Sequence, residues 1–335
     1  MNHKIKIIGL LGFIFLGLYY YIFKANNINV ETPYYLTLEK NTPSNEVIDL
    51  LKKEQVFKNE WAFDFVLGLK SLKNVPKGRY KIVAPLGNYE LISKLKNGYQ
   101  DPLNFTLSTA TFVEEIGGKV GSKLQMDSTE FMSFLYADST LNKYNLNRDN
   151  ALCFFIPNTL EMYWTISKEQ FMARFEKENE KFWTASNLEK AKKLNLTPNQ
   201  VYILASLVQK EYYKKEERSK IATVLLNRMK INMPLQVDAT CKYATKDFAA
   251  KRVTQFHTTY DSPHNTYKII GLPPSPICMP EKSTIEAVLN PDSHDYLYYC
   301  ADPSLNGFHI FSTTLAQHEK VASTYHSKMN ELKIK

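Results

Sequence analysis

Residues 197–240 read TPNQVYILASLVQKEYYKKEERSKIATVLLNRMKINMPLQVDAT. Thr197, Pro198 and Gln200 form a capping-box pattern with proline at the first helical position, which predicts the start of a helix. Apolar residues then recur at spacings of three and four, at Val201, Leu204, Leu207 and Val208. This spacing predicts an amphipathic helix that packs one face against a core.

A carboxylate falls inside the apolar stripe of this helix. With about 100° per residue and Leu204 at zero, Val208 lies at about 40° and Glu211 at about 340°. Because desolvation disfavours a charged carboxylate, Glu211 must be paired with a cation or be partly neutral. A carboxyl with a raised pKa suits the general acid of a glycosidase. A buried ion pair with Arg228, on the apolar face of the next helix, is the alternative.

The composition indicates a globular protein. Of 335 residues, 44% are hydrophobic and 13% aromatic, which is too much apolar surface for a disordered chain. The net charge is +8, but the charges are mixed along the chain and no nucleic-acid motif is present, so we expect no nucleic-acid partner. The four cysteines are widely spaced. This spacing favours buried thiols, and three disulfide pairings remain open.

The amino terminus carries a candidate membrane span. Residues 7–23 are uncharged and apolar, with Lys4 and Lys6 before them and Lys24 after them. A helix of this length just crosses a bilayer core of about 30 Å. A cleaved signal peptide is less favoured because the small-residue cleavage pattern is missing. The positive-inside rule then predicts residues 1–6 in the cytoplasm, an anchor at 7–24, and the remainder outside.

Two folded parts follow the anchor. Residues 33–101 alternate short strands with short helices, one of which carries Trp61, Phe65 and Leu69 at four-residue spacing. This part has no cluster of convergent polar groups, so we expect it to bind or to act as a spacer. Residues 103–335 are long enough for one larger domain of mixed helices and strands. The fold class predicted from sequence is α+β.

Several motifs in order resemble one family. LASLVQKE followed by EERSKIATVLLNRMKINMPLQVDAT resembles the signature region of the endolytic murein transglycosylases, the YceG-like family. Further matches are FIPNT at 155–159, SPHNTY at 262–267, GLPP at 271–274, and late residues His309, Phe311 and His318. The resemblance covers nearly the whole chain. It implies a single transmembrane helix, a small LysM-like module at 33–101 and a larger mixed α/β catalytic domain at 103–335.

The resemblance also implies an activity and a location. Family members cut peptidoglycan glycan strands internally with one catalytic glutamate, are anchored once in the cytoplasmic membrane, and work near peptidoglycan synthases. The matching glutamate is Glu211. Substrate contacts carry over to Gln236, Asp238, Asn265 and Tyr267. No cofactor and no metal are expected, because no carboxylate or cysteine stands at metal-ligand spacing from the late histidines.

Some positions depart from the family pattern. The chain has Gln209 at the first of two acidic places, Tyr212 in place of a threonine, Ala239 in place of a proline, and His264 in place of a tyrosine. Glu281 stands where the family has glycine. The departures at Gln209, Ala239 and Glu281 keep a second hypothesis open, an inactive wall-binding scaffold. Asn265 and Tyr267 also have structural interpretations, as a turn cap and a packing residue.

The topology is directly testable. Protease added to the outer face of intact spheroplasts should digest the bulk of the chain and leave a small membrane-bound stub, because only residues 1–24 are expected in the membrane or the cytoplasm. Complete protection would contradict the assignment. So would a soluble mature protein that lacks these residues.

Overall fold

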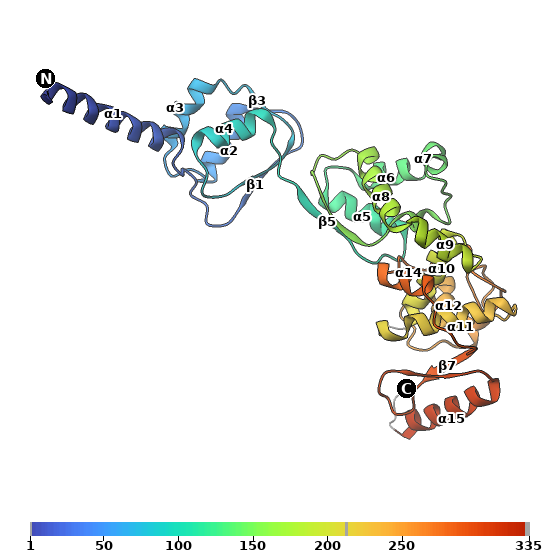
Figure 1. Ribbon diagram of the computed structural model, residues 1–335. Helices are drawn as coiled ribbons and strands as arrows, with labels where there is room; N and C mark the ends of the chain where they lie inside the picture. The colour runs from blue at the N-terminus through green and yellow to red at the C-terminus, as the bar shows by residue number, and fades with distance from the viewer. Residues whose placement is uncertain (1, 212–213, 332–335) are drawn as a thin grey trace. The chain divides into compact units, whose positions relative to one another are not determined.

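Figure 1 shows the computed structural model, which describes residues 2–211 and 214–331. The chain divides into two compact units. The first comprises Met1–Phe105, Gly121–Asp127 and Leu160–Ser167. The second comprises Thr106–Val120, Ser128–Thr159 and Lys168–Lys335. Two short segments that follow residue 103 therefore group with the amino-terminal part of the chain.

The first unit begins with the long apolar helix α1, Asn2–Phe23. Its segment Ile5–Phe23 has 19 residues and is long and apolar enough to cross a membrane. At about 1.5 Å per residue this segment is about 28 Å long, close to the thickness of a bilayer core. The helix is a candidate anchor, in agreement with the apolar run seen in the sequence.

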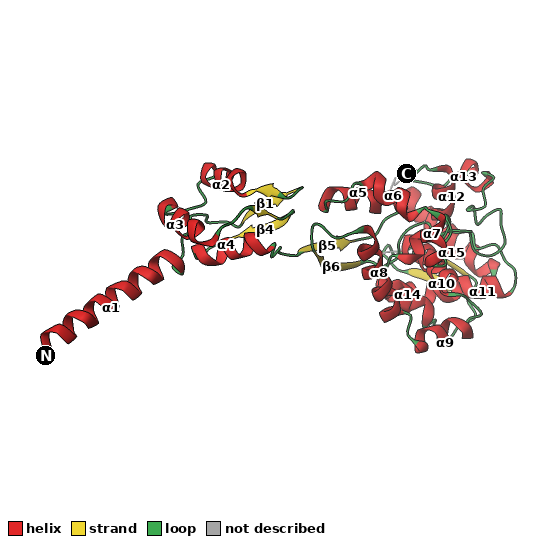
Figure 2. Cartoon of the chain, turned by 90° about the horizontal axis from the view of Figure 1, so that it is seen from above, coloured by secondary structure: helices red, strands yellow, loops and turns green. Residues whose placement is uncertain are grey.

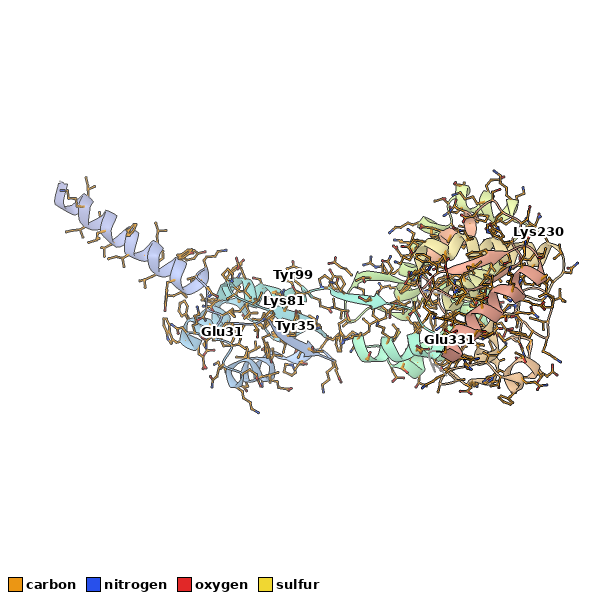
Figure 3. All side chains as sticks on the ribbon, turned by 90° about the horizontal axis from the view of Figure 1, so that it is seen from below. Glu31, Tyr35, Lys81, Tyr99, Lys230 and Glu331 are labelled. Atoms are coloured by element: carbon orange, nitrogen blue, oxygen red, sulfur yellow. The ribbon has the colours of Figure 1, made fainter. Side chains whose placement is uncertain are left out.

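The rest of the first unit is a small α+β fold. In chain order its elements are β1 Tyr34–Leu38, β2 Thr42–Pro43, α2 Ser44–Lys53, α3 Glu60–Lys70, β3 Asn74–Val75, β4 Gly78–Ile82 and α4 Asn88–Asn97. Strand β1 pairs antiparallel with β4, and β2 pairs with β3. Tyr35 and Lys81 lie opposite each other in the β1–β4 pair and are labelled in Figure 3. Helix α4 is capped at its carboxyl end by Gly98, whose φ of 66° is the left-handed conformation that glycine adopts at little cost.

The core of the first unit lies between the helices and the β1–β4 sheet. Leu36, Tyr80 and Ile82 of the sheet are buried together with Leu51 of α2 and Leu91 of α4. Helix α3 contributes a different face from the one its sequence pattern emphasised. Its buried residues are Ala62, Phe63 and Val66, whereas its stripe of Trp61, Phe65 and Leu69 is exposed.

Buried asparagines fasten the end of α1 to this fold. Asn27 Nδ2 donates to Asn88 Oδ1 at 2.7 Å, and Asn88 Nδ2 donates to the carbonyl of Ile22 at 2.7 Å. Asn27 Oδ1 accepts from the backbone N–H of Asn59, the residue that caps α3. Because buried polar groups are expensive to leave unpaired, these bonds fix where α1 joins the unit.

The second unit is mainly helical (Figure 2). Strands β5 Leu103–Leu107 and β6 Asn158–Met162 pair where the chain passes from one unit to the other. The remaining elements are α5 Val113–Lys123, α6 Ser128–Leu135, α7 Asp138–Lys143, η1 Ala151–Phe154, α8 Lys168–Phe182, α9 Ala185–Lys193, α10 Pro198–Glu211, η2 Lys215–Glu217, α11 Arg218–Lys230, α12 Asp238–Thr245, α13 Gln255–Thr259, α14 Lys282–Leu289, β7 Tyr298–Ala301, β8 His309–Ser312 and α15 Leu315–Glu331. Among the described residues the strands form four two-stranded sheets. The predicted α+β class is confirmed.

Helix α10 is the central element of the second unit. It packs against α14, α11 and α12, and every residue from Val201 to Val208 is buried. The predicted helix is therefore present but is covered on all sides. Two polar groups on it are satisfied internally: Tyr202 donates its hydroxyl hydrogen to the carbonyl of Phe155 at 2.6 Å, and Ser206 Oγ accepts from the N–H of Ile277.

The cysteines are unpaired thiols. Cys153, Cys241 and Cys278 are buried, and Cys300 on β7 is half-buried. Burial raises the pKa of Cys278 to about 12, so this thiol keeps its proton. The structure thus agrees with the buried-thiol interpretation of the spacing.

Candidate active site

Glu211 is the last residue of α10, at the point where the buried helix reaches a cleft. Its carboxylate Oε2 accepts a hydrogen bond of 2.5 Å from the hydroxyl of Tyr299. Tyr299 belongs to β7, which forms an antiparallel hairpin with β8 in which Tyr299 lies opposite Phe311. Two segments 88 residues apart in sequence therefore meet at this carboxyl.

The cleft has a volume of about 280 Å³ and a largely polar lining. Its walls come from the ends of α10 and α11, the start of α12 with the loop before it, the loop after α13, the β7–β8 hairpin and α15. The lining residues are Glu211, Arg228, Gln236, Asp238, Tyr267, Tyr299, Cys300, Ala301, His309 and His318. Four of the five residues that the sequence suggested for the site are in this set.

The electrostatics of the cleft keep a proton on Glu211 near neutrality. Its pKa is raised from 4.5 to about 7, chiefly because burial disfavours the ionised form. The negative charge of Asp238 raises the pKa further, whereas the hydrogen bond from Tyr299 and the positive charge of Arg228 lower it. A carboxyl with a pKa near 7 can both donate and recover a proton at neutral pH.

Arg228 does not form an ion pair with Glu211. None of the ion pairs among the described residues joins Arg228 to that carboxylate; the guanidinium instead donates from Nε to the carbonyl of Leu297 and from Nη1 to that of Leu235, both at 2.6 Å. Arg228 is buried. Its two hydrogen bonds join the segment before β7 to the loop that leads to Gln236. The structural ion pair considered as an alternative role for Glu211 is thus absent.

Asp238 and Tyr267 form a pair across the cleft. Tyr267 donates its hydroxyl hydrogen to Asp238 Oδ1 at 2.6 Å, and Asp238 is the first residue of α12. Burial raises the pKa of Tyr267, so the phenol stays protonated. The second carboxylate of the cleft is exposed and already accepts this bond.

Gln236 has an unusual backbone conformation. Its φ is +50°, in the left-handed region that costs a residue other than glycine about 1 kcal/mol or more. Its N–H donates to the carbonyl of Thr266 at 3.1 Å, and its side chain is exposed along the cleft. Strained backbone of this kind persists where the surrounding structure fixes it, and it is common at binding sites.

Asn265 lies behind the cleft and does not line it. The residue is fully buried, and its Nδ2 donates to the carbonyls of His257, Thr258 and Tyr260. Its Oδ1 accepts from the N–H of Tyr267. With its amide fully engaged, Asn265 holds the loop that carries Tyr267, and the direct substrate contact expected from the sequence stays a prediction.

Tyr299, His309 and His318 are among the cleft residues that were not assigned a site role from the sequence. Tyr299 lies in an aromatic run whose partner strand could not be inferred. His309 donates its backbone N–H to Glu217 Oε1 at 3.0 Å and is bonded through Nδ1 to Glu217 Oε2 at 2.8 Å. His318 stacks on Tyr298, and its Nδ1 is buried with no hydrogen-bond partner among the described residues. His309 and His318 both match residues near the end of the family's sequence pattern, and this match is the feature of the sequence that could have indicated a site role.

Two departures from the family pattern lie together outside the cleft lining. Gln209 Oε1 accepts from Thr284 Oγ1 at 2.6 Å and from the N–H of Glu281 at 3.2 Å. Glu281 in turn pairs with Arg218 at 2.8 Å, which lowers the pKa of its carboxyl. His264 is bonded to Ser275 and also lies away from the cleft. Tyr212 lies outside the described residues.

A model of the YceG-like family matches residues 36–324. The chain belongs to this family. It is 29% identical to the endolytic murein transglycosylase of Bacillus subtilis, with 88% of this chain and 86% of that protein covered. It is 27% identical to the endolytic murein transglycosylase of Streptococcus pneumoniae serotype 2, covering 94% of this chain but only 63% of that protein.

A solved structure resembles the fold. The crystal structure of a yceG-like protein from Listeria monocytogenes has a TM-score of 0.56 with 23% sequence identity, and the match covers 87% of this chain and 99% of that chain. The likeness supports the fold of the YceG-like chain. In the part of this chain that the structure describes, no group of three histidine, cysteine, aspartate or glutamate side chains is arranged to hold a metal ion.

The hydrogen bond from Tyr299 gives a direct test of the electrostatics at Glu211. Tyr299→Phe removes a donor that stabilises the ionised carboxylate, so the pKa of Glu211 should rise above 7. A hydrogen bond to a charged group contributes about 1.5–3 kcal/mol, which corresponds to a shift of roughly one to two units. NMR titration of the labelled carboxyl measures this shift. Tyr296→Phe, outside the cleft lining, is the matched control, and an unchanged or lowered midpoint in Tyr299→Phe would contradict the assignment.

Proposed function

We propose that this YceG-like chain is a membrane-anchored peptidoglycan lytic transglycosylase that cuts glycan strands internally. Its curated relatives carry the name endolytic murein transglycosylase. The observation that carries the proposal is the carboxyl of Glu211, with a pKa of about 7, at the edge of a polar cleft. General acid catalysis needs a group that is protonated before the reaction and ionised after the proton is transferred.

In the proposed mechanism Glu211 acts twice. Its proton goes to the glycosidic oxygen of the bond between the alternating amino sugars, and the bond to the anomeric carbon of the muramic acid breaks. The resulting carboxylate then takes the proton of the C6 hydroxyl of the same sugar, whose oxygen attacks that anomeric carbon. The carboxyl recovers its proton and no water is consumed. The products are a 1,6-anhydro end and a new hydroxyl on the other sugar.

Hydrolysis by two carboxylates is the competing chemistry within the same cleft. Glycosidases that use water generally employ one carboxyl as the acid and a second to activate water or to attack the sugar. Asp238 is the second carboxylate of the cleft. Its bond from Tyr267 occupies one oxygen and holds the group, which favours a role in binding over one in activating water.

The other site residues receive different roles in this proposal. Gln236, Asp238 and Tyr267 contact the sugar amide and hydroxyl groups, which fits their place in the lining. Asn265 acts through the loop that it holds. Tyr299 orients the carboxyl of Glu211 and limits the rise of its pKa.

The proposal extends to organisation and location. Residues 1–6 lie in the cytoplasm, residues 7–24 form the anchor, residues 33–101 form a LysM-like module, and residues 103–335 form the catalytic domain outside the membrane. Peptidoglycan synthases are the expected protein partners, because an internal cut releases strands as they are made.

An inactive wall-binding scaffold is the second candidate, suggested by the departures from the family pattern. Gln209 and Glu281 are absent from the cleft lining and bond to each other, which limits their effect on the chemistry. Ala239 is the second residue of α12, directly after Asp238. A scaffold would also gain nothing from a half-buried carboxyl whose ionisation is disfavoured.

The first test is Glu211→Gln, which keeps the shape of the side chain but cannot transfer a proton. Cleavage of purified sacculi should fall by a factor on the order of 10²–10⁴, measured as muropeptide release by mass spectrometry. Gln209→Ala should change the rate much less, because Gln209 lies outside the cleft.

Stability measurements separate loss of chemistry from loss of fold in this variant. The folded pKa of Glu211 is raised above its ordinary value of 4.5, so the stability that its proton provides is lost as the pH rises through about 7. Glu211→Gln removes that dependence, and at pH values above 7 it should unfold at the same temperature as the native protein or higher. Near-native cleavage by the variant would contradict the role of Glu211 as the acid, and unfolding of the variant would favour a structural role for this residue.

The second test concerns the product. The proposed mechanism yields 1,6-anhydro ends that are lighter than hydrolytic ends by one water and carry no oxygen from the solvent. Digestion of sacculi in heavy-oxygen water, followed by mass spectrometry, distinguishes the two. Reducing ends that contain the solvent label would refute the lytic mechanism and would make Asp238→Asn the next variant to measure.

A further inference from the structure

Helix α3 exposes three large apolar side chains on one face. Trp61 is 65% exposed, Phe65 46% and Leu69 62%. The rings of Trp61 and Phe65 stack with centroids 5.9 Å apart, so the stripe is continuous. Single exposed apolar residues are ordinary in soluble proteins, but a contiguous stripe that includes tryptophan marks an interaction surface.

The stripe is not needed for the core of the first unit. Ala62, Phe63 and Val66 on another face of the same helix fill that role and are buried. Helix α3 is therefore apolar on two faces, and its acidic residues Glu60 and Asp64 lie on a third. Since the core is complete without the stripe, a partner outside the described fold is the remaining reason for it.

The stripe adjoins the end of the apolar helix α1. Phe65 lies edge to face with Phe23, the last residue of α1, with ring centroids 6.4 Å apart. Asn59, the cap of α3, donates to the hydroxyl of Tyr21 at 3.5 Å. Figure 1 shows α3 beside the carboxyl end of α1. The surroundings of the last turn of α1 are therefore also in contact with α3.

The residue types at this junction are those found at a membrane surface. Tyr19, Tyr20, Tyr21 and Phe23 at the end of α1 continue into Trp61 and Phe65 of α3, and aromatic residues concentrate where a bilayer meets water. Two lysines flank the junction. Lys70 and Lys24 lie over the ring of Tyr89, with Nζ 3.9 Å and 5.1 Å from its centroid. Ammonium groups at this level match lipid phosphates.

We propose that α3 is an interfacial helix that inserts its stripe of Trp61, Phe65 and Leu69 into the outer surface of the membrane; this inference rests on the proposed anchoring of the chain by α1. An amphipathic helix buries its apolar face at the boundary between headgroups and acyl chains. Because α1 already tethers α3 to the membrane, the effective concentration of lipid at α3 is high, and a modest affinity of α3 for the membrane is sufficient. Asn88 bonds to Ile22 of α1 and to Asn27, and Asn27 accepts from Asn59 at the start of α3, so these asparagines fix α3 relative to the end of α1. The first unit is thus fixed to the membrane at two places.

Tryptophan fluorescence of the full chain tests this contact without measuring activity. The chain contains three tryptophans, so Trp164→Phe with Trp183→Phe leaves Trp61 alone. This variant is reconstituted into vesicles that contain anionic phosphatidylglycerol and lipids brominated near the headgroup end of the acyl chain. Trp61 should emit at shorter wavelength than a tryptophan in water and should be strongly quenched by the bromines. The matched control, Trp61→Phe with Trp183→Phe, leaves Trp164 of the same unit, which should be quenched less.

A second variant ties the signal to the stripe. Phe65→Gln with Leu69→Gln, added to the chain with Trp61 alone, replaces two exposed side chains and spares the core. Burial of each favours the inserted state by roughly tenfold, so the pair should return the quenching of Trp61 to the level of the control. Unquenched, water-like emission of Trp61 in the first variant would overturn the proposal. A wavelength shift without quenching that grows with the protein-to-lipid ratio would overturn it in favour of contact between copies of the chain.

Discussion

The chemistry of this molecule depends on where a buried helix stops. Helix α10 is enclosed by protein from Val201 to Val208, and its last residue, Glu211, reaches the cleft. Enclosure supplies the desolvation that raises the pKa of the carboxyl to about 7. A site on a mobile loop would have neither the fixed position nor the dry surroundings.

Arg228 shows how the second unit carries a buried cation beside that carboxyl without neutralising it. The guanidinium is satisfied by the carbonyls of Leu235 and Leu297, and it acts on Glu211 through space only. A direct ion pair would have held the carboxylate ionised and lowered its pKa well below neutrality. The same two bonds brace opposite walls of the cleft, because one reaches the loop of Gln236 and the other the segment that leads into β7. Electrostatic tuning and mechanical support therefore come from one side chain.

Local residue spacing predicted the helices of the site, whereas contacts that depend on the pairing of distant strands could not be predicted from the sequence. The helix ending at Glu211 followed from its cap and apolar period, and the family motifs pointed to Gln236, Asp238 and Tyr267. Tyr299 could not be predicted, because its role depends on a hairpin 88 residues away from Glu211. Asn265 illustrates a different limit, since an asparagine that contacts a ligand and one that satisfies a loop look the same in sequence. Along α3 the stripe and the core face have the same period, so spacing alone could not say which was buried.

Gln209 and Glu281 are in direct contact, so their departures from the resembled motifs are not independent of each other. The sequence motifs that this chain resembles carry an acid at position 209 and a glycine at 281, whereas this chain has a neutral amide at the first place and an acid at the second. The backbone of Glu281 donates to Gln209, and its carboxylate pairs with the nearly buried Arg218. Two carboxylates here would repel each other, and the loss of Glu281 would leave Arg218 without its carboxylate partner. In this chain the acid that partners Arg218 stands at the start of α14, and the neutral amide of Gln209 holds its backbone without charge repulsion, so the two residues act as one unit and should be substituted together.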